Sequence, residues 1–360
     1  MKDSYLTAGI KFNHLFRLLK RNKVSFTFRN LLRLAFLLQG ACWSSLFSWI
    51  EKVRFSKALK NTPVPDDPVF IIGHWRTGST LLHQLMSLDP QLNAPTLFQV
   101  ALPDSFLVSY PYYRPMFRMF ISGHRPMDQV RIGMDEPQED EYAIYRITNF
   151  SPLEKLVFAT TDSYFLNRET RFLPSGDDLE KWKNEVKAFF RKLHFANNKR
   201  IVSKNPFNSF RIKVLHDMFP NAKFIHIVCH PDDVIPSAIN MWNILQKQNQ
   251  LTNPVNPPRF EAVADLLEHL LSEIETDHKQ LLPDQYVEVR FEDLEKKPVA
   301  VLKQIYESLH LPFSTEFELK INGFIRQTAN FRKNDFSLTP RDKLYIRKIL
   351  AIHMNKYNYQ

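Results

Sequence analysis

The chain has 360 residues, of which 44% are hydrophobic and 24% are charged, so it is a globular protein with enough apolar residues for one large or two small cores. Its two cysteines, Cys42 and Cys229, are too few for a disulfide framework. The net charge of +10 lies entirely in residues 1–60, which hold 12 basic and 2 acidic residues, so the charge does not indicate a nucleic-acid-binding domain.

The first 60 residues predict a basic helical arm. Basic residues alternate with Leu and Phe up to Arg33, and Leu34–Ile50 then carry no charge before basic residues return at Lys52. This apolar stretch is short for a spanning helix. We therefore expect an amphipathic helix that lies on an anionic membrane surface. A helix packed on the main domain and a spanning helix are the alternatives.

No clear small-residue cleavage site follows the apolar stretch, which argues against a signal peptide. We therefore expect a cytoplasmic protein that is at most peripheral on the inner face of a membrane. Residues 61–68 contain three prolines and predict a linker at the start of a main domain over residues 61–360.

A short apolar strand, Val69–Ile72, opens the main domain. It ends at Gly73, and a second glycine, Gly78, precedes an apolar helix-like run. A strand, a tight loop and a helix start direct backbone N–H groups at one point and attract an anion. The glycine spacing matches the nucleotide P-loop, but Ser79 stands where that motif has its lysine, and Arg76 supplies a cation instead.

Short runs rich in Val, Ile and Phe predict three further buried strands, at residues 201–204, 223–228 and 286–290. Helices are predicted at residues 80–88, 178–193, 209–218, 234–246, 260–278 and 299–309. The alternation predicts an α/β fold with a central parallel sheet covered by helices on both faces, and a nucleotide at the carboxyl ends of the strands. No zinc spacing is present, so we expect no metal.

Four blocks in this order together resemble the sulfotransferase family: Gly73–His83, Ser203–Pro206 with Phe219–Val228, His230–Ser237, and Arg290–Leu294 with Phe331–Thr339. The acidic segment Asp135–Tyr142 is similar to the bacterial-type branch. The resemblance covers residues 65–360. It implies a P-loop-like sulfotransferase fold and a reaction that moves a sulfuryl group from PAPS, the sulfate donor, to a hydroxyl or amine without a metal.

The resemblance also implies residue roles. Arg76, Thr77, Gly78, Ser79 and Thr80 would cradle the 5′-phosphosulfate of PAPS. Lys204 would stabilise the leaving group, and Ser237, Arg332 and Lys333 would hold the 3′-phosphate.

The chain departs from the family at Cys229, where relatives carry an arginine eight residues before the serine. Loss of one charged hydrogen bond, worth about 1.5–3 kcal/mol, would weaken PAPS roughly 10- to 150-fold unless His230, Arg332 or Lys333 compensates.

The resemblance does not supply the acceptor base. Pro206 stands where cytosolic relatives have a histidine, and Gln99 stands where others have a glutamate. The remaining candidates are Glu139, then Glu141 and His83. If the acidic segment is helical, Glu136, Glu139 and Asp140 share one face.

Residues 98–120 are rich in aromatic side chains, which would wall a hydrophobic, lipid or glycan-type acceptor or simply form core. Cys229, Gln99 and Pro206 support an alternative function, a catalytically silent adaptor that binds PAP or another nucleotide on the same fold.

Overall fold

The computed structural model describes residues 6–120, 123–124, 131–159, 168–253, 256–328 and 336–359, which form two compact units. One unit, here called the helical unit, comprises residues 1–64, 95–198 and 241–257. The other, the sheet unit, comprises residues 65–94, 199–240 and 258–360. The predicted boundary between an arm at 1–60 and a main domain at 61–360 stays a prediction.

The sheet unit is built on a five-stranded parallel sheet with the strand order β2-β5-β1-β6-β7. The strands are β1 (Val69–Ile72), β2 (Leu92–Asn93), β5 (Arg200–Lys204), β6 (Lys223–Val228) and β7 (Tyr286–Arg290). The four strands predicted from the sequence are confirmed. The two-residue β2 is too short to carry a readable pattern.

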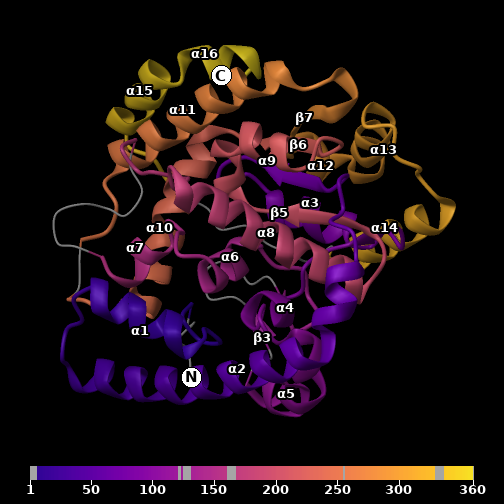
Figure 1. The fold of residues 1–360 in the computed structure, drawn as a ribbon. Helices are drawn as coiled ribbons and strands as arrows, with labels where there is room; N and C mark the ends of the chain where they lie inside the picture. Colours follow the sequence, from indigo (N-terminus) through magenta and orange to yellow (C-terminus); the bar gives the residue numbers. More distant parts are fainter. Residues whose placement is uncertain are drawn as a thin grey trace. The chain divides into compact units, whose positions relative to one another are not determined.

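Side chains alternate between the two faces of this sheet. Val69 and Ile71 of β1 belong to a buried cluster with residues of α3, α13 and α14. Phe70 stacks on Phe224 of β6, with ring centroids 5.4 Å apart, on the opposite face. In Figure 1, α11 lies on one side of β6 and β7 and α13 on the other, so the prediction of helices on both faces is confirmed.

The helices of the sheet unit are α3 (Ser79–Met86), η1 (Pro206–Phe210), α9 (Ile212–Met218), α11 (Phe260–Asp277), η2 (His278–Gln280), η3 (Pro283–Gln285), α12 (Phe291–Lys296), α13 (Pro298–Ser308), α14 (Thr315–Thr328), α15 (Pro340–Ile349) and α16 (Ala351–Lys356). The first part of α10 (Pro231–Asn249) also belongs to this unit, and its second part belongs to the helical unit.

The helical unit contains α1 (Phe12–Arg21), α2 (Phe28–Asn61), α4 (Leu97–Ala101), α5 (Phe106–Phe120), α6 (Glu141–Ile147), α7 (Glu154–Val157), α8 (Asp177–Ala196) and the pair β3 (Gly123–His124) and β4 (Arg131–Ile132). Helices α1 and α2 occupy the region of the predicted basic arm. Figure 1 shows α2 as one long unbroken helix with α1 beside it.

A buried ion pair joins α2 to α8. The Lys192 ammonium bonds the Glu51 carboxylate and also donates to the Pro103 carbonyl at 2.6 Å. The Leu107 amide donates to the other Glu51 oxygen at 2.8 Å. Because burial opposes both charges, it raises the pKa of Glu51 and lowers the pKa of Lys192, and each charge depends on the other.

We expect Lys192→Met to lower the free energy of unfolding by about 3–5 kcal/mol, because it leaves the Glu51 charge buried without its cation. The measurement is urea unfolding followed by circular dichroism. Lys181→Met on the same helix is the control, since its pair with Asp178 is exposed and should contribute less than about 1 kcal/mol. Equal effects of the two substitutions would show that the buried pair does not hold α2 in place.

Candidate functional site

The loop between β1 and α3 is shaped by residues with positive φ. Gly73 has φ +134°, and an added Cβ would lie 2.4 Å from the Ile227 carbonyl oxygen. Gly78 has φ +84°, and its added Cβ would lie 1.9 Å from the Phe291 ring. Glycine is therefore required at both positions. Arg76 also has φ +73°, a conformation that costs a side-chain-bearing residue about 1–2 kcal/mol.

Helix α3 begins directly after Gly78. The first N–H groups of a helix have no partner within the helix and favour an anion. Two hydrogen bonds fix the loop that leads to these N–H groups. Thr77 Oγ1 donates to the His74 carbonyl at 2.7 Å, and the Gly73 amide donates to Ser209 Oγ at 2.9 Å. The result is a fixed loop followed by a helix start, which is the geometry of the anion cradle that the sequence predicts for residues 76–80.

Two residues with different predicted roles meet at this cradle. Arg76 Nε donates a hydrogen bond of 2.9 Å to Ser237 Oγ, which belongs to α10. The structure therefore brings the predicted 5′-phosphosulfate residue beside the predicted 3′-phosphate residue.

Lys204 is the last residue of β5 and pairs with Ile71, the next-to-last residue of β1. It therefore lies at the carboxyl ends of the strands, where the loop also begins. Its side chain is only 3% exposed. Burial first, and then the Lys204 charge, lower the pKa of His83 to about 3. The His83 ring is therefore neutral at physiological pH, with Nε2 3.3 Å from the Val202 carbonyl, and it is a poor proton acceptor.

The acidic candidates lie in the helical unit. Helix α6 begins at Glu141, so Glu136 and Glu139 precede it and the expected shared helical face is wrong. Residues 136–138 instead run antiparallel to residues 95–97, where the Leu97 amide donates to the Glu136 carbonyl at 2.9 Å and the Gln138 amide donates to the Pro95 carbonyl at 2.8 Å. Glu141 is fully buried and accepts a 2.6 Å hydrogen bond from Ser151.

The remaining predictions concern Gln99, the cations Arg332 and Lys333, and a metal. Gln99 closes a capping box with Thr96, which is a structural task. Arg332 and Lys333 lie outside the described residues. Among the residues that the structure describes, no group of three or more His, Cys, Asp or Glu could hold a metal ion.

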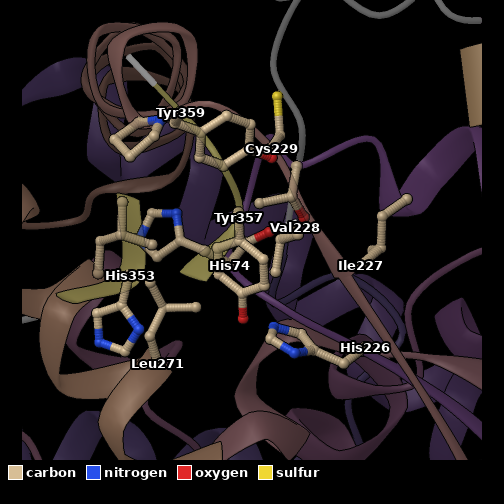
Figure 2. Close-up of a pocket in the computed structure, with 12 residues that line it drawn as sticks. His74, His226, Ile227, Val228, Cys229, Leu271, His353, Tyr357 and Tyr359 are labelled. Atoms are coloured by element: carbon tan, nitrogen blue, oxygen red, sulfur yellow. Dashed lines mark hydrogen bonds between the residues drawn. The ribbon is translucent and has the colours of Figure 1, made fainter. Parts of the chain in front are cut away.

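Cys229 follows β6 and lines a small cavity together with His74, His226, His353, Tyr357 and Tyr359 (Figure 2). The cavity has about 10 Å³ for the centre of a water-sized sphere, which is room for about one water molecule. It is far too small for a nucleotide. The Nε2 atoms of His74 and His226 are buried and have no hydrogen-bond partner among the described residues, so a single water fits this cavity.

A cation, Arg290, lies on the strand beside Cys229, and both residues act on Tyr359. Arg290, at the end of β7, pairs in register with Val228 of β6, the residue before Cys229. Its guanidinium carbon lies 4.8 Å from the centre of the Tyr359 ring, and its Nε lies 3.7 Å from the Glu292 carboxylate. Phe291, the next residue, is the one whose ring closes on Gly78 of the cradle. Sequence spacing gave no sign of this proximity.

Glu288 of β7 is bonded to two residues that line this cavity, His226 and Tyr357. One of its oxygens accepts hydrogen bonds from His226 Nδ1 at 2.9 Å and from the Tyr357 hydroxyl at 2.8 Å. Burial raises the pKa of Glu288, but the bonds and charges of His226, Tyr357 and Lys356 outweigh it and lower the pKa from 4.5 to about 2. His226 is therefore a buried histidine whose Nδ1 atom has a hydrogen-bond partner.

We expect Glu288→Gln to flatten the acid dependence of stability. A carboxyl group with a lowered folded-state pKa stabilises the fold above pH 4.5, and that contribution disappears as the pH falls towards 2. Urea unfolding at a series of pH values between 6 and 2 measures the effect. The exposed Glu307→Gln is the control, and an unchanged pH dependence in Glu288→Gln would contradict the assignment.

A family model described as "Sulfotransferase family" matches residues 68–315. A curated relative, the omega-hydroxy-beta-dihydromenaquinone-9 sulfotransferase Stf3 of Mycobacterium bovis and of Mycobacterium tuberculosis, is 29% identical over 365 residues. The match covers 98% of this chain and 91% of the relative.

Two solved structures share the fold. The sulfotransferase STF9 from Mycobacterium avium superposes with a TM-score of 0.66 at 15% identity and covers 99% of this chain and 93% of its own. The sulfotransferase STF1 from Mycobacterium tuberculosis gives 0.59 at 17% identity and covers 93% and 91%. The predicted fold class is therefore confirmed.

Proposed function

Because this chain belongs to the sulfotransferase family and is an enzyme of sulfuryl transfer, we propose that it moves the sulfuryl group of PAPS to a hydroxyl group of a lipid-type acceptor. The observation that carries the proposal is a buried lysine, Lys204, at the carboxyl end of its strand, beside the cradle between Gly73 and Gly78. The predicted amine and glycan acceptors remain alternatives within the same chemistry.

In the proposed reaction the acceptor oxygen attacks sulfur in line, and negative charge develops on the bridging oxygen of the leaving phosphate. The Lys204 ammonium would stabilise that charge, while Arg76 and the first N–H groups of α3 hold the 5′-phosphate. A sulfuryl group carries less charge than a phosphoryl group, so fixed cations and N–H groups can take the place of a metal. Glu139, which is partly exposed, is the proposed proton acceptor, because Glu141 is fully buried and its carboxylate is bonded to Ser151.

The donor's 3′-phosphate needs a cation that Cys229 cannot provide. We assign this role to Arg290, together with Ser237 and with the predicted Arg332 and Lys333. Arg290 lies on the neighbouring strand and pairs with Val228, the residue before Cys229. The Tyr359 ring and Glu292 orient its guanidinium. With Arg290 in the role of the arginine that relatives carry at the position of Cys229, the chain keeps a cation for the 3′-phosphate, which supports an active enzyme. Cys229 favours the second candidate function, the silent nucleotide-binding adaptor.

The Stf3 relative is a sulfotransferase for an omega-hydroxy-beta-dihydromenaquinone-9, which supports a lipid-type acceptor here. Such an acceptor resides in a membrane, and we place the enzyme at the cytoplasmic face. In the part of the chain that the structure describes, one helix, α2, has the length and hydrophobicity of a membrane-spanning helix, a test that core helices and signal sequences also pass.

The test is sulfuryl transfer from sulfur-labelled PAPS by the full-length protein in detergent. The acceptor panel contains a hydroxylated isoprenoid quinone, a sterol, a long-chain alcohol, a phenol and an oligosaccharide. We expect label in one of the lipid hydroxyl acceptors. PAP binding without transfer to any member would favour the adaptor, and transfer to the oligosaccharide alone would contradict the acceptor class.

A further inference from the structure

Helix α2 buries its polar side and exposes its apolar side. Its buried residues are Asn30, Arg33, Leu37, Ala41, Ser44 and Glu51, and four of these six are polar. At 100° per residue these form one stripe, and the large apolar residues lie on the opposite side. Those residues, here called the α2 apolar face, are between 40% and 67% exposed: Leu31, Leu32, Phe36, Leu38, Trp43, Leu46, Trp49 and Val53. A helix that packs on a protein core does the reverse.

Specific polar contacts hold the polar stripe inward at both of its ends. The Asn30 amide donates to the Leu251 carbonyl at 3.1 Å, and the Arg33 guanidinium donates to the carbonyls of Gln250 and Gln248 at 2.9 Å each. Glu51 bonds Lys192, as described above. Rotation of α2 would leave these groups buried without partners, so the apolar face is fixed outward.

Basic side chains flank the α2 apolar face at both ends. Lys23 and Arg29 are exposed at its start, and the exposed residues Lys52, Arg54, Lys57 and Lys60 follow its end. Residues 1–60 hold 12 basic and 2 acidic residues in all. An apolar face with basic ends complements an anionic lipid surface. A second copy of this chain would bring the same positive charge and be repelled.

We propose that α2 docks flat on the anionic surface of a lipid membrane through its apolar face, and that it does not span the bilayer. A spanning helix would have to release Arg33 and Glu51 from their partners in the helical unit. The inference goes beyond the proposed transfer reaction, because vesicle binding needs neither donor nor acceptor. Its failure and the failure of the proposed reaction are therefore separate results.

The chain carries its own probe for this docking. Of the five tryptophans, Trp75, Trp182 and Trp242 are at most 3% exposed, whereas Trp43 is 51% and Trp49 is 64% exposed. Changes in tryptophan emission on vesicle binding therefore report on α2. The full-length protein is mixed with vesicles of phosphatidylcholine containing roughly one third phosphatidylglycerol. We expect a blue shift and co-sedimentation, both much weaker with pure phosphatidylcholine.

Two double variants test the two parts of the surface. Leu46→Ser with Val53→Ser removes apolar area and keeps both tryptophans, and Lys57→Glu with Lys60→Glu reverses the charge. Each is expected to weaken vesicle binding at least tenfold. One lysine near an anionic surface contributes about fivefold, and burial of one Leu or Val side chain contributes about tenfold or more. The control is Leu319→Ser with Leu344→Ser in the sheet unit, where the leucines are 66% and 71% exposed. Circular dichroism verifies that all variants fold.

The proposal is overturned if the wild-type protein does not bind anionic vesicles, or if binding survives both double variants. Concentration-dependent dimerisation that Leu46→Ser with Val53→Ser abolishes, without vesicle binding, would assign the face to a second copy instead. Protein that stays in the membrane after alkaline carbonate extraction would identify a spanning helix and would also overturn the proposal. Release by carbonate is the supporting outcome.

Discussion

Replacing Lys204 by methionine is expected to lower kcat for sulfuryl transfer about 10²–10³-fold, the usual effect of removing one preorganised group that stabilises transition-state charge. Methionine fills the space of the lysine stem at this buried position and removes only the charge. PAP affinity is expected to change much less than kcat, because the lysine acts on charge that develops during the reaction. Initial rates at saturating acceptor, together with calorimetric PAP binding, measure both quantities.

Lys204→Arg and Lys343→Met serve as the matched variants for this prediction. Arginine restores the positive charge and should recover part of the activity, and Lys343 is an exposed residue of α15 whose loss should have no effect. Since the Lys204 charge helps to depress the pKa of His83, that pKa should also rise in Lys204→Met. Wild-type kcat in Lys204→Met would remove the proposed leaving-group role.

Gly78→Ala is expected to destabilise the sheet unit by about 2–4 kcal/mol and to abolish PAP binding. The left-handed φ of +84° costs alanine about 1 kcal/mol, and forcing a methyl group 1.9 Å from the Phe291 ring costs about 1–3 kcal/mol more. The displaced loop would no longer aim the N–H groups of α3 at the phosphate. Urea unfolding and PAP calorimetry measure the two effects.

A second glycine and a relieving substitution make this prediction specific. Gly40 lies inside α2 with nothing within 4 Å of an added Cβ, so Gly40→Ala should stabilise the protein by about 0.5–1 kcal/mol. Phe291→Ala in the Gly78→Ala background opens space but leaves the cost of the positive φ, so it should recover only part of the loss. A Gly78→Ala protein of wild-type stability that binds PAP would refute the cradle geometry.

The core of the sheet unit could be predicted because its strands are short, buried and bounded by clear breaks. Val69–Ile72 and Lys223–Val228 appear with the predicted bounds, and the loop followed from two glycines at fixed spacing. The sequence predicted an amphipathic helix in this region but not which of its residues pack on the protein. The six buried residues of α2 recur at helical spacing between Asn30 and Glu51, and four of them are polar, so the buried stripe could be recognised only in the folded chain.

The candidate site was predictable only where its residues are neighbours in sequence. Residues 76–80 come from one loop, whereas Arg290 approaches Cys229 through the register of β6 with β7, which no spacing in the sequence encodes. The helical reading of Glu136 and Glu139 failed because residues 136–138 pair with the distant residues 95–97, and α6 begins only at Glu141. Pairing across strands is a long-range property that needs the folded chain.

The most direct test of a PAPS-dependent enzyme on this scaffold is the calorimetric affinity of the full-length protein for PAP compared with AMP, which lacks the 3′-phosphate. We predict that the wild-type protein binds PAP at least tenfold more tightly than AMP, that Arg290→Ala removes most of this preference, and that Cys229→Arg in the Arg290→Ala background restores it, as expected for a charged hydrogen bond worth about 1.5–3 kcal/mol. Equal affinity of the wild-type protein for PAP and AMP, or no binding of either, would contradict the proposed donor.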